Sequence, residues 1–272
     1  MLAVLAIGGC GGSGSQAPAA GARSPSSAPA SSAGTDPAGT PASQASAAVC
    51  SSQRHAVDGG TYMVQNNEYG SGAQECLAVG GAGGFTVSRS AIANSTDGTP
   101  GGYPSIYRGC HWGVCTPDSG LPVPVSKLLS PGAVTTTWDT TQPGTGTYDV
   151  AYDIWFNQTP TTGGQPNGAE LMIWLNHNGP VEPFGRPVGT TTIDGRSYRV
   201  WFGDQGWDTI SYSMVTGTTS VRNLDVGQFV ADALHRGYIQ NSWYLIDVEA
   251  GFELWQGGAG LATNSFAVHV SG

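Results

Sequence analysis

After Cys50, short stretches of alternating hydrophobic and polar residues are separated by clusters of glycine, proline, asparagine and aspartate. The clusters lie at 80–84, 97–102, 144–146, 163–168 and 176–180. Strand-like stretches at such short spacing are typical of a β-sandwich or jelly roll. Only 224–236 has helical spacing, with Asn223 or Asp225 as possible caps and Gly237 as its end. The pattern predicts an all-β fold with one helix packed on the outside of the sheets.

Three of the predicted strands place carboxylates and large apolar side chains on the same face. They span 152–156, 170–175 and 244–255, and successive side chains of a strand point to opposite faces. The residues that share this face are Asp153 and Trp155; Glu170, Met172 and Trp174; and Asp247, Glu249, Gly251, Glu253 and Trp255. Aromatic planes suit sugar rings, and glycoside hydrolysis needs one ionised and one protonated carboxyl group. The pattern favours a glycosidase, but it leaves open a binding module or adhesin with exposed strand charges.

The aromatic residues mark where the folded part begins, because the first of them is Tyr62. Residues 11–49 are almost wholly Gly, Ser, Ala, Pro, Thr and Gln, which predicts a disordered linker; a poorly packed domain edge is the alternative. Residues 50–272 then form one domain. Residues 1–10 resemble the tail of a bacterial lipoprotein signal that ends at a lipidated Cys10. A plain secretory signal, cleaved elsewhere, is the alternative.

The other four cysteines indicate an oxidising compartment. Cys50, Cys76, Cys110 and Cys115 allow three pairings, of which Cys50–Cys76 with Cys110–Cys115 is the simplest. Free thiols in a cytosolic protein are the alternative, but the front end of the chain favours export and disulfides. We therefore expect an extracellular protein, either secreted or lipid-anchored at the cell surface.

Charge and histidine content disfavour several classes of partner. Ten basic residues against 19 acidic ones give a net charge of −9, which disfavours nucleic acid and anionic membrane surfaces. No apolar run reaches the ~20 residues that a membrane-spanning helix needs. The five histidines show no paired metal-ligand spacing, and His111 is either a cleft residue or an ordinary loop residue. We expect a monomer without metal or cofactor.

Several motifs resemble those of glycoside hydrolase family 12, and the resemblance covers essentially all of 50–272. The motifs are Glu170-Leu-Met-Ile-Trp174, the run from Gly251 to Phe266, Tyr152-Asp-Ile-Trp155, and Tyr103-Pro-Ser105 with the cysteines that follow it. The family implies a β-jelly-roll sandwich of two antiparallel sheets, with a cleft on the concave sheet and one packed α-helix. It implies an endo-β-1,4-glucanase that acts on cellulose-type β-glucan.

The resemblance also assigns roles to the carboxylates. It makes Glu170 the nucleophile, Glu253 the acid/base and Asp153 an auxiliary residue beside the nucleophile. Asp247 and Glu249 become structural or cleft-edge groups. The implied reaction retains configuration through a covalent glycosyl-enzyme, which requires the two catalytic carboxyl groups to lie roughly 5–5.5 Å apart.

One position departs from the family pattern. The family usually has Trp two positions after the second Asn of an Asn-Asn motif, whereas Tyr69 occupies this position after Asn67 here. We expect Asn67, Tyr69, Met172 and Trp174 to contact substrate, with simple core packing as the alternative for Trp174. Preference for xyloglucan or mixed-linkage glucan stays open, as does a non-catalytic carbohydrate-binding jelly roll.

Overall fold

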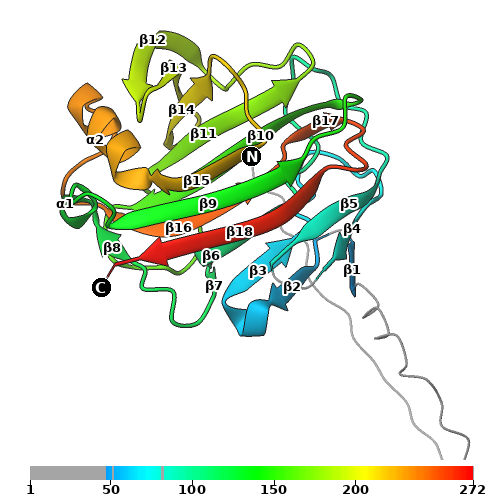
Figure 1. The fold of residues 1–272 in the computed structure, drawn as a ribbon, viewed down its shortest axis with the longest axis horizontal. Helices are drawn as coiled ribbons and strands as arrows, with labels where there is room; N and C mark the ends of the chain where they lie inside the picture. The colour runs from blue at the N-terminus through cyan, green and yellow to red at the C-terminus, as the bar shows by residue number, and fades with distance from the viewer. Residues whose placement is uncertain (1–46, 51, 81–82, 272) are drawn as a thin grey trace, which may run out of the picture. The chain divides into compact units, whose positions relative to one another are not determined.

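The computed structural model describes residues 47–50, 52–80 and 83–271, and most of them belong to two β-sheets (Figure 1). One sheet has six strands. In spatial order they are β1 (Ala47–Cys50), β4 (Glu75–Val79), β5 (Phe85–Ser90), β18 (Ala262–Val270), β9 (Val134–Thr141) and β15 (Ser220–Asp225). Each strand pairs antiparallel with its neighbours.

The larger sheet carries the three strands with carboxylates on one face. Its main path is β12 (Arg186–Ile193), β13 (Arg196–Asp204), β14 (Asp208–Met214), β11 (Ala169–Asn178), β10 (Thr147–Asn157), β16 (Tyr244–Gly251), β6 (Ser105–His111), β3 (Tyr62–Gln65) and β2 (Arg54–Val57). Three short strands join it: β17 (Leu254–Gln256) pairs with β10, β7 (Val114–Cys115) with β6, and β8 (Val123–Pro124) with β16.

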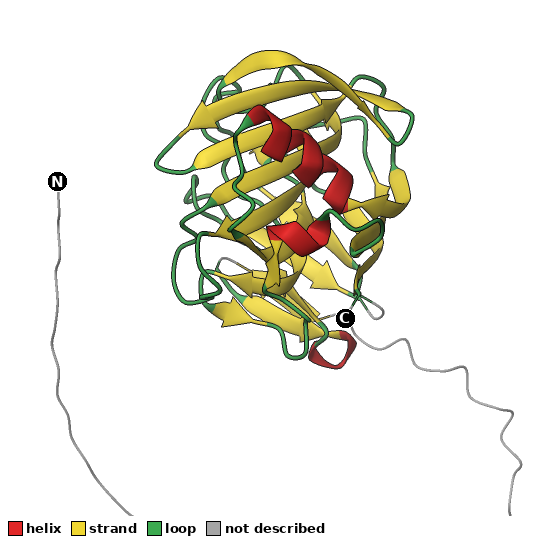
Figure 2. Ribbon diagram, turned by 90° about the vertical axis from the view of Figure 1, so that its left-hand side faces the viewer, coloured by secondary structure: helices red, strands yellow, loops and turns green. Residues whose placement is uncertain are grey.

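The hydrophobic core lies between the two sheets, whose layers are seen in Figures 1 and 2. Trp138 of β9 meets Tyr152 of β10 with ring centroids 5.1 Å apart, and Phe85 of β5 meets Phe252 at 5.9 Å. Tyr152, Ile154 and Phe156 face this core, as the alternation predicts. Asp153 and Trp155 therefore lie on the opposite face, and the predicted jelly-roll sandwich is confirmed.

The main helix is α2 (Val226–Arg236), with α1 (Val125–Leu128) and the 3₁₀ turn η1 (Asp58–Gly60) as shorter elements. Asp225 caps α2 by accepting a hydrogen bond from Gly227 N at 3.0 Å, and Gly237 ends it at φ +82°. Phe229 packs against Tyr198 and Tyr212 with ring centroids 5.3 Å apart in both pairs. The helix thus packs its apolar face against β13 and β14 of the larger sheet (Figure 2), which confirms the predicted single packed helix. Within the described residues, neither helix has the length and hydropathy to span a membrane.

The larger sheet differs in two ways from the predicted pattern. β11 pairs with β14 in parallel, so this sheet is not wholly antiparallel. In the pairing of β10 with β16, Trp155 lies opposite Asp247 whereas Phe156 lies opposite Leu245. This bulge at Ile246 shifts the alternation by one residue, so Leu245 joins the core in place of Ile246.

Both simple disulfides are present. Cys50 and Cys76 lie directly opposite each other on β1 and β4, and Cys110–Cys115 joins β6 to β7. Because β1 begins at Ala47, residues 47–49 belong to a sheet, although the composition places them in the linker. The rest of the predicted linker, the signal-like segment and Cys10 lie outside the described residues.

Candidate active site

The face of the larger sheet that points away from the core carries the predicted site residues. Glu170, Met172 and Trp174 lie on β11, and Asp153 of β10 lies directly opposite Met172. Met172 and Trp174 belong to a small apolar cluster with Trp255, separate from the main core. This apolar cluster lies beside the carboxylates on the same face of the sheet.

Glu170 is 7% exposed, and three donors surround one of its carboxylate oxygens. Oε2 accepts hydrogen bonds from Thr209 Oγ1 at 2.9 Å, Trp207 Nε1 at 3.0 Å and Gln205 Nε2 at 3.3 Å. The parallel pairing of β11 with β14 places Thr209 directly opposite Glu170, and Gln205 and Trp207 lie on the turn that precedes β14. The site therefore holds this carboxylate in a fixed orientation.

Burial and hydrogen bonding act in opposite directions on Glu170. Burial raises its pKa and the hydrogen bond from Trp207 lowers it, while the charge of Glu253 raises it further; the balance is a pKa of about 7. Hydrogen bonds from Thr209 and Gln205 also favour the ionised form. The ionisation of Glu170 therefore depends on the charge of Glu253.

Glu253 lies between β16 and β17 and is fixed through its own main chain. Its N–H donates to Asp149 Oδ1 at 3.0 Å, and its carbonyl accepts from Asp149 N at 3.1 Å. The Tyr69 hydroxyl donates to Glu253 Oε1 at 3.2 Å. Burial raises the pKa of Glu253, while hydrogen bonds with Asp149 and Tyr69 oppose the rise. A raised pKa is the property that a general acid needs.

Asp149 is a member of this cluster that the sequence reasoning missed. It lies on β10, four residues before Asp153 and on the same face, and it is fully buried. Burial, followed by the charge of Glu253, raises its pKa well above the usual value. The alternation along 149–155 was a usable signal, because it places Asp149 and Asp153 on one side of the strand.

Asp153 is 7% exposed, and its Oδ1 has no hydrogen-bond partner. Burial, then the charges of Glu170 and Glu253, raise its pKa well above the usual value. Four carboxyl groups this close and this buried cannot all be ionised at neutral pH. The cluster therefore holds at least one proton while leaving another group free to be an anion.

Aromatic side chains extend along the same face from the Glu170 side. Trp155 lies opposite Glu170 in the register of β10 and β11, with its ring 5.7 Å from that of Trp207 and 4.9 Å from that of Trp112. Trp112 and Tyr69 are 37% and 50% exposed, so their rings are open to a ligand. Trp112 and Trp207 were not among the predicted contacts, because they lie in connections outside the predicted strands.

The remaining predicted contacts are less exposed. Trp174 is 2% exposed and lies between the rings of Trp255 and His177, at 6.4 and 6.2 Å. Asn67 is half-buried with φ +43°, and its carbonyl accepts from Tyr103 N at 3.1 Å. This bond fixes the start of the segment that carries Tyr69.

Comparison with known proteins matches this site to one family. The model of glycosyl hydrolase family 12 matches residues 60–271. "Probable cellulase Cel12b" of Mycobacterium tuberculosis is 39% identical over 153 residues, which are 56% of this chain and 99% of the relative. "Endoglucanase S" of Pectobacterium parmentieri is 30% identical over 177 residues, or 62% of this chain and 65% of the relative.

Solved structures agree with the sequence relatives. Endoglucanase cel12A from Rhodothermus marinus has a TM-score of 0.78 and 44% identity, covering 83% of this chain and 99% of that one. A metagenome-derived family 12 endoglucanase has a TM-score of 0.79 and 41% identity, with 83% and 98% covered. The match to the family model spans most of the chain, and these structures share its two-sheet fold. The chain therefore belongs to glycosyl hydrolase family 12.

Proposed function

We propose that this protein is a retaining endo-β-1,4-glucanase that cleaves internal bonds of cellulose-type glucans. Family membership supports the reaction class, and relatives named cellulase and endoglucanase support the substrate. The observation that carries the residue assignment is the contrast between two glutamates on one buried face. Glu170 Oε2 accepts three hydrogen bonds, which favour the anion, whereas Glu253 Oε1 accepts one, from Tyr69.

In the first step, a carboxylate oxygen of Glu170 forms a bond to C1 of the sugar as the glycosidic C–O bond breaks. The proton of Glu253 passes to the departing glycosidic oxygen. In the second step, Glu253 takes a proton from water as the water oxygen bonds to C1, and the bond between C1 and Glu170 breaks. The product keeps the β configuration. Asp153, buried beside Glu170, is the auxiliary residue that tunes the ionisation of the nucleophile.

The test combines product stereochemistry with matched variants. Anomeric NMR of products from unbranched cello-oligosaccharides should show the β anomer first. Glu170→Gln and Glu253→Gln should each abolish turnover while preserving oligosaccharide binding. Asp194→Asn, on the exposed turn between β12 and β13, is the control and should keep wild-type activity. Initial formation of the α anomer would refute the retaining mechanism, and wild-type turnover by Glu170→Gln would refute the nucleophile.

A second substrate distinguishes the proposed role of Glu170 from that of Glu253. A dinitrophenyl cellobioside has a leaving group that departs without protonation, so glycosylation by Glu253→Gln should proceed and release a burst of dinitrophenol. Glu170→Gln should release none, because it cannot attack C1. Equal loss in both variants would contradict the separate roles.

Xyloglucan is the second candidate substrate. A family 12 xyloglucanase from Bacillus licheniformis has a TM-score of 0.74 with 27% identity, covering 83% of this chain and all of that one. Tyr69 also offers a smaller stacking surface than the tryptophan usual at this position. Initial rates on cellulosic, mixed-linkage and xyloglucan polymers decide between the preferences.

We further propose that the protein works outside the cytoplasm as a monomer. The two disulfides support an oxidising compartment. Lipidation at Cys10 is tested by fatty-acid labelling of the full chain against Cys10→Ser, and loss of label in the variant is the expected result. Analytical ultracentrifugation tests the monomer.

A further inference from the structure

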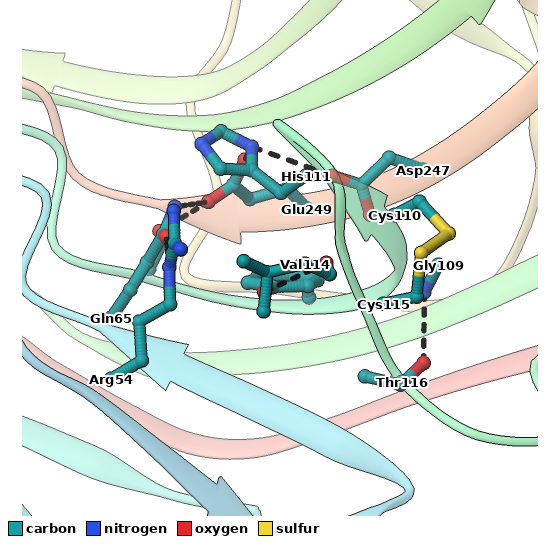
Figure 3. A network of polar contacts seen from close by, with 12 residues as sticks. Arg54, Gln65, Gly109, Cys110, His111, Val114, Cys115, Thr116, Asp247 and Glu249 are labelled. Atoms are coloured by element: carbon teal, nitrogen blue, oxygen red, sulfur yellow. Dashed lines mark hydrogen bonds and ion pairs between the residues drawn. A yellow bond between two sulfur atoms is a disulfide. The ribbon is translucent and has the colours of Figure 1, made fainter. Parts of the chain in front are cut away.

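A second group of ionisable residues lies on the larger sheet, at β6 and β16, and the glucanase reaction does not use it. His111 Nδ1 lies 2.9 Å from Glu249 Oε2 and 3.5 Å from Asp247 Oδ2 (Figure 3). The three residues are 5%, 0% and 0% exposed. His111 Nδ1 and Glu249 Oε2 have only the 2.9 Å contact with each other, and both oxygens of Asp247 have no hydrogen-bond donor. Because buried polar atoms are nearly always paired, this shortage of donors indicates a missing cation.

Glu249 is fixed in place by its other oxygen. Oε1 accepts hydrogen bonds from Gln65 Nε2, at 2.6 Å, and from the Ser105 hydroxyl. Arg54 Nε in turn donates to Gln65 Oε1 at 2.9 Å. This chain of contacts leaves Oε2 directed at His111, as Figure 3 shows. Carboxylates that bind metals are commonly oriented in this way by outer hydrogen bonds.

His111 is held by a closed hairpin. The Cys110–Cys115 disulfide joins β6 to β7 next to it, and Gly109 and Thr116 exchange two hydrogen bonds of 2.9 and 3.1 Å. Gly109 lies opposite Asp247 with φ +124°, and a Cβ there would be 2.4 Å from the carbonyl oxygen of Ile246. Only glycine permits this close approach of β6 to β16. The backbone therefore places the imidazole against the two carboxylates before any ligand arrives.

Protonation of His111 is the alternative to a bound metal ion, because an imidazolium also supplies positive charge to the two carboxylates. Burial lowers the pKa of His111, but the charges and hydrogen bonds of Glu249 and Asp247 raise it to about 9. One N–H cannot satisfy three carboxylate oxygens, and an imidazolium beside two ionised carboxylates leaves a net charge of −1. Burial raises the pKa of Asp247 to about 7, so a proton on Asp247 is a second competitor for the ion. A divalent ion bound to a neutral imidazole and two carboxylates gives a neutral centre.

The distances from His111 Nδ1 to the two carboxylate oxygens fit such an ion, and all three ligand atoms lie within 4.8 Å of one another. Bonds of 2.0–2.2 Å around a tetrahedral ion place neighbouring ligand atoms about 3.4 Å apart. The contacts of 2.9 and 3.5 Å bracket this value. One nitrogen and two oxygens suit zinc or manganese better than calcium or magnesium, which prefer oxygen alone.

We propose that His111 Nδ1 and one oxygen each of Asp247 and Glu249 bind a divalent first-row transition-metal ion. Glu249 lies directly opposite Asp153 in the register of β10 and β16. The ion would therefore neutralise a carboxylate next to the catalytic cluster and lock β6 onto β16. The histidine spacing did not predict the site because its ligands come from two strands far apart in the chain.

The experiment uses the untagged full-length chain, stripped with EDTA and dialysed into metal-free buffer. Titration calorimetry with Zn²⁺ alone should give one site per chain, and Zn²⁺ should raise the melting temperature. Asp247→Asn and His111→Gln should each weaken binding at least tenfold. His235→Gln, which removes an exposed histidine of α2, is the matched control and should bind as wild type.

The wild-type measurement decides the proposal even if a variant fails to fold. Absence of Zn²⁺ binding by the stripped wild-type chain overturns it and leaves the protonated histidine as the cation. Binding that is unchanged in folded Asp247→Asn and His111→Gln places the ion elsewhere and also overturns it. Neither readout depends on glucan hydrolysis, so failure here is separate from failure of the proposed function.

Discussion

Thr209→Val isolates one of the three hydrogen bonds that favour the anion of Glu170. Thr209 is 1% exposed, and its hydroxyl donates to Glu170 Oε2 at 2.9 Å. Valine has nearly the same shape but no hydroxyl, so the change removes the donor and leaves the packing of β14 in place. Gln205 Nε2 also loses an acceptor at 3.0 Å, but it keeps its contact with Glu170.

The expected change in the pKa of Glu170 follows from the free energy of the hydrogen bond that is removed. A hydrogen bond to a charged group contributes about 1.5–3 kcal/mol, and about 1.4 kcal/mol corresponds to one pKa unit. Two donors stay on the same oxygen, so we expect the lower end of this range, a rise of about one unit. The pKa of Glu170 would move from about 7 to roughly one unit higher. Because the proposed nucleophile must be ionised, activity should be lost as pH falls through this pKa.

The assay is the pH profile of kcat/KM on a soluble cello-oligosaccharide, which reports the free enzyme. The acidic limb of Thr209→Val should shift about one pH unit upward, and the rate on that limb should fall about tenfold. Thr136→Val is the matched control, because Thr136 is equally buried but lies on β9 of the other sheet. It should lower stability without moving the limb. An unshifted acidic limb in folded Thr209→Val would refute the electrostatic account of Glu170.

Two further changes probe the surroundings of the cluster. Tyr69→Phe removes the hydroxyl that donates to Glu253, so the pKa of Glu253 should rise and the basic limb should move to higher pH; a shift to lower pH would contradict this. Replacing Cys50 and Cys76 together by serine opens a bridge with a sequence separation of 26, which should lower the free energy of unfolding by about 3 kcal/mol in denaturant titrations. Unchanged stability would show that the strand pairing of β1 suffices without the bridge.

The sequence predicts those features of the site that depend on local alternation. Asp153 and Glu170 share a face with their apolar neighbours because successive side chains of any strand point to opposite sides. Asp149 follows the same rule, because it lies four residues before Asp153 on β10. The short spacing of strand-like segments indicates a sandwich or jelly roll. Pairing each cysteine with its neighbour along the chain gives both bridges, although Cys50 and Cys76 are 26 residues apart.

Features that depend on distant pairing were not predictable. Thr209 reaches Glu170 because β11 and β14 pair in parallel, with 39 residues of chain separating the two side chains. No alternation within either strand encodes that register. The bulge at Ile246 was not predictable either. The pairing with β10, a distant strand, determines that Ile246 has no directly opposite residue.

The position of the Cys50–Cys76 bridge affects how the fold bears mechanical load. A pull on the chain at Ala47 first peels β1, and the peeling stops where Cys50 is covalently joined to β4. The force then enters the six-stranded sheet instead of passing on to β2, which belongs to the sheet that carries Glu170. Reduction of this bond would expose β2 to the same tension, so the bridge shields the sheet that carries Glu170 from a pull on the preceding chain.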